Sequence, residues 1–192
     1  MSHKTYTTEA IVCGSFQKRT TDLSYRLFTK DFGMLLATAR GVRKESSRQR
    51  YALQDFSYLK LSLIKGKNGW IVGSIEPYEN FYHRAESKEA RGSVVALCRF
   101  LSRFVVGNQT DDEMFTYVTK SLAMLANQME NRSFARLVVE VNLLSRLGYV
   151  KEKSIPKELL MASPAVAIGH YGTDKEDTLR QLYTQAITVS QL

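Results

Sequence analysis

The sequence is poor in the residues that build most metal sites. Its 192 residues include two cysteines, Cys13 and Cys98, which stand far apart in separate apolar runs. No CxxC, HxxxH or HExxH pattern occurs, so a zinc site has no recognisable set of ligands. We therefore predict that both cysteines are small, buried, reduced hydrophobic residues.

Motifs of nucleotide-driven and triad enzymes are also missing. No GxxxxGK[ST] phosphate loop or dinucleotide fingerprint is present. His3, His83 and His170 have no serine or cysteine partner in a recognisable motif. The acidic run Asp111-Asp112-Glu113 resembles a metal cluster, but its place at a predicted helix start is explained by the helix dipole. A non-enzymatic protein is the expectation.

Long apolar runs are absent as well. Residues 1–8 are polar and have no signal-peptide core. No run approaches the roughly 18 apolar residues of a membrane span. The 44% hydrophobic and 24% charged composition is typical of globular proteins, and the length allows one large or two small domains. A cytoplasmic protein without membrane contact is expected.

Positive charge is plentiful and uneven. The formal net charge is +8, of which residues 1–80 hold +6 from 13 Lys/Arg and 7 Asp/Glu. The densest run is residues 39–50 (ARGVRKESSRQR), where five basic residues stand against Glu45 alone. Such a run suits a polyanion, because lysines and arginines displace the counterions of a phosphate backbone. A flexible, solvated surface loop is the alternative interpretation.

The first 80 residues have the pattern of a small β-barrel. Five short stretches alternate or are rich in β-branched residues, and no segment between them has helical periodicity. They are residues 5–14, 23–29, 34–39, 53–64 and 70–75. Residues 31–33 (Asp-Phe-Gly) predict a tight turn with Gly33 at positive φ. An OB-type barrel is the commonest five-stranded fold that binds oligonucleotides, and an SH3-like barrel fits nearly as well.

Basic and aromatic residues gather in the loops of this predicted barrel. The candidate phosphate-binding residues are Arg40, Arg43, Lys44, Arg48, Arg50, Lys18, Arg19, Lys65 and Lys67. Phe16 and Phe32 are expected in loops. Phe16 and Tyr51 are the candidates for base stacking, whereas Phe56 and Trp70 are expected to pack in strands.

Helical periodicity begins after Pro77. Apolar residues at three- and four-residue spacings predict a helix from Ser87 to a stop at Gly107-Asn108. Capping boxes at residues 110–113 and 173–176 predict two further helix starts, and another helix should run from about Ser133 to Gly148. The predicted fold class is α+β, with an OB barrel in residues 1–80 and a helical domain in residues 81–192.

Several motifs resemble the RecO family of bacterial recombination mediators. They are TTEAIV at 7–12, LFT with a glycine at 33, ARGVRK at 39–44, Ser47 with Arg50, LQDF at 53–56 and LLSRLGY at 143–149. The match in order and spacing runs from about Tyr6 to Phe81. This resemblance implies an OB domain followed by a helical domain, with no cofactor and no nucleotide hydrolysis.

The resemblance also implies a function and partners. Family members bind single- and double-stranded DNA, anneal complementary strands, join RecR, and help load RecA onto DNA coated with single-strand-binding protein. A cytoplasmic, nucleoid-associated protein of DNA damage repair is thus expected. The helical domain of the family receives the acidic C-terminal tail of the single-strand-binding protein, for which Arg99, Arg103, Arg132 and Arg136 are candidates here.

The chain departs from the family after Tyr149. Many relatives carry a four-cysteine zinc module there, but no cysteine follows Cys98 in this chain and the C-terminal segment is short. Zinc binding is therefore not expected. Two alternatives to a DNA mediator stay open: an OB-fold adaptor that binds an acidic protein, and an RNA-binding protein without annealing activity.

Overall fold

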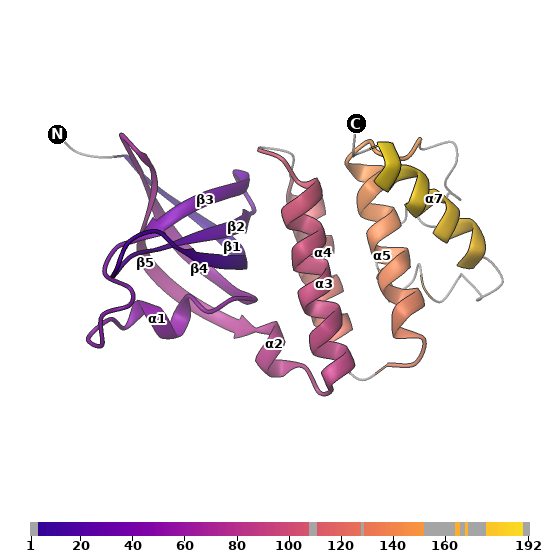
Figure 1. Cartoon of the computed structure of the whole chain (residues 1–192), viewed down its shortest axis with the longest axis horizontal. Helices are drawn as coiled ribbons and strands as arrows, with labels where there is room; N and C mark the ends of the chain where they lie inside the picture. Colours follow the sequence, from indigo (N-terminus) through magenta and orange to yellow (C-terminus); the bar gives the residue numbers. More distant parts are fainter. Residues whose placement is uncertain are drawn as a thin grey trace.

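The computed structural model describes residues 4–107, 111–127, 129–151, 164–165, 168 and 176–189. A β-barrel formed by the N-terminal part of the chain is followed by helices that extend away from it (Figure 1). The α+β fold class is confirmed.

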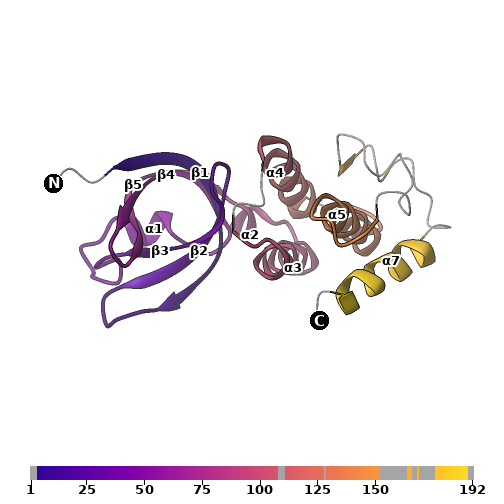
Figure 2. The same cartoon turned by 90° about the horizontal axis from the view of Figure 1, so that it is seen from above.

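The barrel has five strands in a closed Greek-key order. They are β1 (Thr5–Gln17), β2 (Leu23–Thr29), β3 (Gly33–Ala39), β4 (Ser57–Gly66) and β5 (Gly69–Asn80). The order around the ring is β1-β2-β3-β5-β4, and the β3–β5 pair is parallel while the others are antiparallel. Seen from above, these strands enclose a ring (Figure 2). This is the OB-like arrangement that the strand pattern predicted.

The length of β1 allows the ring to close. Its first half pairs with β4 from Thr5 to Ile11, and its second half pairs with β2 from Ala10 to Gln17. The register shifts between Val12 and Gly14, and such a bulge bends a strand. One strand can therefore border two neighbours that face different directions. The β2–β3 turn is as predicted, with Gly33 at a φ of 64°.

Alternate residues of the strands fill the barrel. Twelve buried residues form this interior cluster: Ala10, Val12, Tyr25, Leu27, Ala37, Ala39, Val42, Leu53, Leu59, Leu61, Leu63 and Val72. Ten of them come from strands, as period-two alternation requires. The other two, Val42 and Leu53, come from the β3–β4 connection, so this connection is anchored in the core.

Several predicted strand limits were wrong. β4 begins at Ser57 rather than Leu53, because residues Gln49–Ala52 form a short helix, α1, and Phe56 has a φ of 71°. β1 continues to Gln17, so Phe16 lies in a strand and not in a loop. β5 passes through Pro77 to Asn80, and the register of β4 and β5 shifts beside it, between Tyr58 and Leu59. Proline is tolerated at such irregularities.

Five further helices follow the barrel in the described part of the chain. They are α2 (Phe81–Arg84), α3 (Lys88–Phe104), α4 (Asp112–Ala126), α5 (Arg132–Arg146) and α7 (Glu176–Val189). Helix α5 lies between the α3–α4 pair and α7 (Figure 1). The predicted helices near 87–107, 110–125 and 133–148 are confirmed within a few residues. The predicted start of the last helix at Thr173 lies outside the described residues.

Helix caps explain where α3 and α4 begin. The Ser87 hydroxyl accepts a hydrogen bond from the Ala90 N–H at 3.1 Å. The Asp111 carboxylate accepts one from the Met114 N–H at 2.7 Å, so Asp111 is the N-cap of α4. The predicted capping box, with Thr110 as the cap and Glu113 as its partner, was therefore wrong by one residue. The acidic run at 111–113 has a structural role at this helix start.

The helices pack on one outer side of the barrel. Ile11, Cys13 and Phe28 point outward from β1 and β2 and belong to the same hydrophobic cluster as the cores of α3, α4 and α5. The Phe28 ring stacks on Phe115 of α4, with 5.5 Å between ring centroids. Cys13 and Cys98 are both buried and reduced, as predicted. Contact with Cys13 and burial raise the pKa of the Cys98 thiol.

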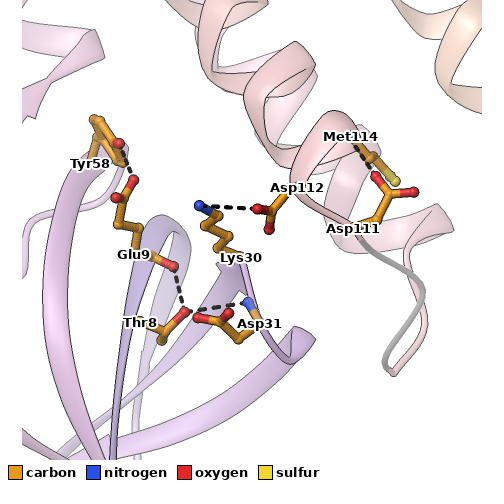
Figure 3. A network of polar contacts seen from close by, with 8 residues as sticks. All are labelled: Thr8, Glu9, Lys30, Asp31, Tyr58, Asp111, Asp112 and Met114. Carbon is orange, nitrogen blue, oxygen red and sulfur yellow. Dashed lines mark hydrogen bonds and ion pairs between the residues drawn. The ribbon is translucent and has the colours of Figure 1, made fainter.

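Polar contacts border this junction (Figure 3). Lys30, in the β2–β3 turn, lies 3.4 Å from the Asp112 carboxylate at the start of α4. On the barrel, the Tyr58 hydroxyl donates to the Glu9 carboxylate, and the Thr8 hydroxyl accepts from the Asp31 N–H at 3.4 Å. Burial raises the pKa of Tyr58, and the hydrogen bond to Glu9 adds to this shift.

Metal-ligand clusters and membrane-spanning helices are both absent from the described residues. These residues contain no group of three or more His, Cys, Asp or Glu side chains arranged to hold a metal ion. None of the helices in the described ranges is long and apolar enough to cross a membrane.

Candidate nucleic-acid interface

A row of residues on the outer face of the barrel crosses all five strands, and Ser24 in this row is buried. Register pairs Phe16 with Ser24, Ser24 with Thr38, Thr38 with Ile71, and Ile71 with Ile64. Paired residues share a face of a sheet, and strands are about 4.8 Å apart, so this outward row is roughly 19 Å long. Phe16 at one end is 45% exposed.

The other end of the outward row forms the floor of a pocket of about 520 Å³, which we call the barrel pocket. The β1–β2 loop, the end of β3 and the β4–β5 turn surround it. Its lining residues are Lys18, Arg19, Asp22, Thr38, Arg40, Ile64, Gly66, Lys67, Asn68, Gly69, Trp70 and Ile71. Loops at these places flank the binding face in OB barrels.

Four of the predicted phosphate-binding residues line the barrel pocket. These rim cations are Lys18, Arg19, Arg40 and Lys67, and all are exposed. The Lys18 ammonium donates a hydrogen bond to the Thr38 hydroxyl at 2.8 Å, which holds it beside the floor. Positive charge from three separate chain segments thus converges on one opening.

The described lining of the barrel pocket includes one acidic residue, Asp22, and its carboxylate already accepts hydrogen bonds from the protein. It accepts a hydrogen bond from the Gly41 N–H at 2.8 Å and one from the Thr21 hydroxyl at 3.2 Å. The Gly41 hydrogen bond is the main reason that the pKa of Asp22 is lowered. The carboxylate therefore fixes the turn after β3, and the positive charge of the rim stays dominant.

The rest of the predicted basic run does not gather at the barrel pocket. The Arg43 guanidinium donates to the Thr20 carbonyl at 3.1 Å, which ties it to the β1–β2 loop. Lys44 is exposed and follows Arg43, whereas Arg48 and Arg50 lie at α1. The Gln49 side chain holds α1 to β5 by donating to the Gly73 carbonyl at 2.7 Å. The run is thus an anchored connection and not a free loop.

Two of the remaining predictions concern the β4–β5 turn. Lys67 lines the barrel pocket, but Lys65 does not, and its ammonium lies 5.8 Å from the centre of the Trp70 ring. The Trp70 ring also packs against Tyr6 and Phe32, with centroids 5.4 Å away in both cases. Phe32, expected in a loop with other exposed aromatics, is therefore part of a packed aromatic cluster.

The two stacking candidates occupy different surroundings. Phe16 stands at the end of the outward row. Tyr51 is 66% exposed on α1, and the Arg50 guanidinium lies 4.8 Å from its ring centre and bonds to its hydroxyl at 2.8 Å. Only Phe16 therefore lies on the same surface as the barrel pocket.

Sequence reasoning missed several residues of this surface. Arg26 is exposed on β2, where it pairs with the 52% exposed Leu36 of β3. Ile64 and Ile71 lie within predicted strands, and no local pattern marks them as part of a binding surface. The alternation of β2 already put Ser24 and Arg26 on one face, but the pairing partners that complete this surface come from distant strands.

A second pocket, of about 480 Å³, lies in the helical region, and we call it the helical pocket. It is lined by Glu89, Gly92, Ser93, Asn131, Arg132, Ser133, Phe134, Arg136 and Glu176. Of the four arginines considered for an acidic tail, Arg132 and Arg136 are here, and Arg99 and Arg103 are exposed elsewhere on α3.

The arginines of the helical pocket have internal partners. Arg132 donates to the carbonyls of Leu125 and, at 2.8 Å, of Asn127, so it caps the end of α4. Arg136 lies 3.5 Å from Glu140, a residue buried between α5 and α7. Burial raises the pKa of Glu140 to about 7 despite Arg136 and a hydrogen bond from Tyr183.

Comparisons with known proteins agree with this architecture. The family model described as "Recombination protein O N terminal" matches residues 1–79, and the one described as "Recombination protein O C terminal" matches residues 89–150. The chain is similar to the DNA repair protein RecO of Desulfitobacterium hafniense, with 29% identity over 75% of this chain and 52% of the relative.

Two other relatives give the same result. The chain is 27% identical to the DNA repair protein RecO of Alkaliphilus metalliredigens, over 63% of this chain and 49% of the relative. It is 26% identical to that of Caldanaerobacter subterraneus, over 74% of this chain and 58% of the relative. The chain spans about half the length of these relatives. Because the two family matches take in the barrel and most of helices α3 to α5, this chain belongs to the RecO family of DNA repair and recombination proteins.

Proposed function

We propose that this protein binds single- and double-stranded DNA through the barrel, anneals complementary strands, and helps RecR to load RecA. The observation that carries the proposal is the convergence of Lys18, Arg19, Arg40 and Lys67 on the barrel pocket. Family membership adds DNA repair and recombination as the process. The protein would act by binding alone, without catalysis.

Charge neutralisation is the proposed mechanism of annealing. Each phosphate contact made by a lysine or arginine releases condensed counterions, which gives affinity without sequence preference. A strand held on the rim cations presents less negative charge to its complement. Two strands can therefore approach more closely on the protein than in free solution.

An annealing assay tests this proposal. The rim variant changes Lys18, Arg19, Arg40 and Lys67 to alanine. A matched control changes Lys60, Lys88, Arg99 and Lys120, which are exposed basic residues elsewhere. Fluorescence transfer between two labelled complementary strands should show fast annealing with the wild type and the control, and annealing close to the protein-free rate with the rim variant.

The other results of this assay point elsewhere. Equal annealing by the rim variant and the wild type would contradict the role of the barrel pocket. Preference for RNA over DNA of the same sequence would favour the RNA-binding alternative. If no oligonucleotide binds at all, a protein adaptor for an acidic partner replaces the DNA proposal.

We also propose that the helical region receives the acidic C-terminal tail of the single-strand-binding protein. This is supported by the family resemblance and by the helical pocket, which is lined by Arg132, Phe134 and Arg136. The test is anisotropy of a labelled tail peptide. Binding should weaken with Arg136→Ala and stay unchanged with Arg26→Ala, and the reverse pattern would contradict this location.

A further inference from the structure

We propose that the barrel pocket receives one unpaired base of a single strand, so that the site holds single strands and duplexes in different ways. This inference rests on the proposed DNA-binding function. Beyond that function, the inference states that the site distinguishes single strands from duplexes, and it names the contacts that do so.

The size and floor of the barrel pocket suit a nucleobase. Its volume of about 520 Å³ is within the range of roughly 300–1,000 Å³ that is typical of small-molecule sites. Ile64 and Ile71 form an outward, half-buried pair on the floor, next to Thr38. A base has apolar faces and a polar edge, and the faces of its ring can pack against the two isoleucine side chains.

The wall made by the β4–β5 turn offers hydrogen-bonding groups to the base edge. Gly69 has a φ of 107°, and, apart from its two chain neighbours, no residue has an atom within 4 Å of the place where a Cβ would stand. The backbone on this side of the pocket is therefore open. Asn68 beside it is exposed, and its amide supplies both donors and an acceptor. A side chain of this kind can serve any of the four bases.

Phosphates next to the inserted base would lie on the rim cations. Lys18 and Arg19 come from the β1–β2 loop, Arg40 from the end of β3 and Lys67 from the β4–β5 turn, which follow one another around the barrel. The Asp22 carboxylate is held by Gly41 and Thr21 and does not occupy the floor. The pocket thus combines an apolar floor, a polar wall and a cationic rim. These three parts are complementary to the faces of a base, its polar edge and the neighbouring phosphates.

A duplex cannot use this pocket without disruption. Its bases are paired and stacked inside the helix, and flipping one out costs a few kcal/mol. A duplex would therefore contact only the rim cations. During annealing, the inserted base must leave the pocket to pair with its complement, so pairing itself would loosen the hold on the product.

The experiment compares three ligands of about 12 nucleotides, which is within the site size of one OB barrel. They are labelled oligothymidylate, the same backbone with every base replaced by an abasic unit, and a duplex. The wild type should bind oligothymidylate about 10-fold more tightly than the abasic strand, as expected for a well-packed base. The variant Ile64→Thr with Ile71→Thr keeps every charge and both β-branched positions. It should lose most of this preference while its affinity for the duplex stays unchanged.

Two further variants serve as controls for the double isoleucine change. Val106→Thr makes the same kind of change at a 64% exposed position outside the barrel and should retain the preference. Ile71→Thr alone disturbs the fold less than the double change and should lose part of the preference. The comparison of intact and abasic strands uses the wild type alone, so it does not depend on whether a variant folds.

Each other outcome overturns the inference. If the wild type binds intact and abasic strands equally, no base enters a pocket, although DNA binding by the rim survives. If both isoleucine variants keep the full preference, bases bind elsewhere on the protein. If no ligand binds, the proposed function fails together with the pocket.

Discussion

The barrel pocket and the helical pocket have similar volumes, and both are lined by arginines, but their charges are used differently. The lining of the barrel pocket has four cations against Asp22. The helical pocket has Arg132 and Arg136 against Glu89 and Glu176. Its arginines already bond to carbonyls of α4 or pair with Glu140. The difference teaches that a site for a long polyanion such as DNA is marked by an excess of positive charge over the acidic groups around it, and not by the number of arginines alone.

Removing Arg132 from the helical pocket should mainly affect stability. Arg132→Ala leaves the carbonyls of Leu125 and Asn127 without their donor, so we expect a loss of about 2 kcal/mol in the free energy of unfolding. Urea denaturation measures it. Lys18→Ala is the matched change in the barrel pocket and should alter stability by about 0.5 kcal/mol or less. A similar loss in both variants would remove the distinction between the pockets.

The buried partner of Arg136 should make stability depend on pH. The pKa of Glu140 is raised from 4.5 to about 7, so the folded protein keeps a proton that the unfolded chain releases. Stability should therefore fall as the pH rises through this window, by about 3 kcal/mol.

Glu140→Gln is the variant that isolates this effect, because it keeps the shape of the side chain without the titrating group. Thermal unfolding is followed below pH 4.5 and above pH 7. The variant should show a smaller decrease than the wild type across the window. An equal decrease in both proteins would assign the pH dependence to other residues.

The two exposed aromatic candidates should differ in their effect on single strands. Phe16 lies on the outward row, so Phe16→Ala should weaken single-strand binding by about 5-fold, the loss of one stacked base. Tyr51 lies on α1 beside Arg50, and Tyr51→Ala should have little effect. Anisotropy of a labelled single strand decides between them, and a larger effect at Tyr51 would move the DNA path toward α1.

Arg26 should make the smallest contribution of the residues considered. It is exposed on β2 beside the outward row, outside the barrel pocket. One phosphate contact contributes about 0.7 to the salt dependence of single-strand binding. Arg26→Ala should lower the slope of log affinity against log salt by this amount. An unchanged slope would show that the DNA does not reach β2.

Local patterns in the sequence predicted most of the barrel. Alternation placed Leu59, Leu61 and Leu63 on one face of β4, and all three are buried in the barrel interior. Asp31-Phe32-Gly33 predicted the β2–β3 turn. The order of the strands was beyond such reasoning, because the parallel β3–β5 pair joins segments separated by the β3–β4 connection and by β4 itself.

The β3–β4 connection is where sequence reasoning failed most. Its many charges suggest one continuous phosphate-binding surface. However, Val42 and Leu53 are buried in the barrel core and fix the path of the connection. As a result, Arg40 lies at the barrel pocket, whereas Arg48 and Arg50 lie at α1. Two apolar residues in a polar segment give a weak signal. The barrel pocket itself was only partly predicted, since Lys18, Arg40 and Lys67 meet through tertiary pairing that no local pattern contains.

The most direct test of the central claim is the salt dependence of single-strand affinity for the wild type and the rim variant. Anisotropy titrations at several salt concentrations give the slope of log affinity against log salt. If the four rim cations each neutralise one phosphate, the slope of the variant should be smaller by about 3. The control variant at Lys60, Lys88, Arg99 and Lys120 should keep the wild-type slope. Equal slopes for the wild type and the rim variant would contradict the claim that DNA binds at the barrel pocket.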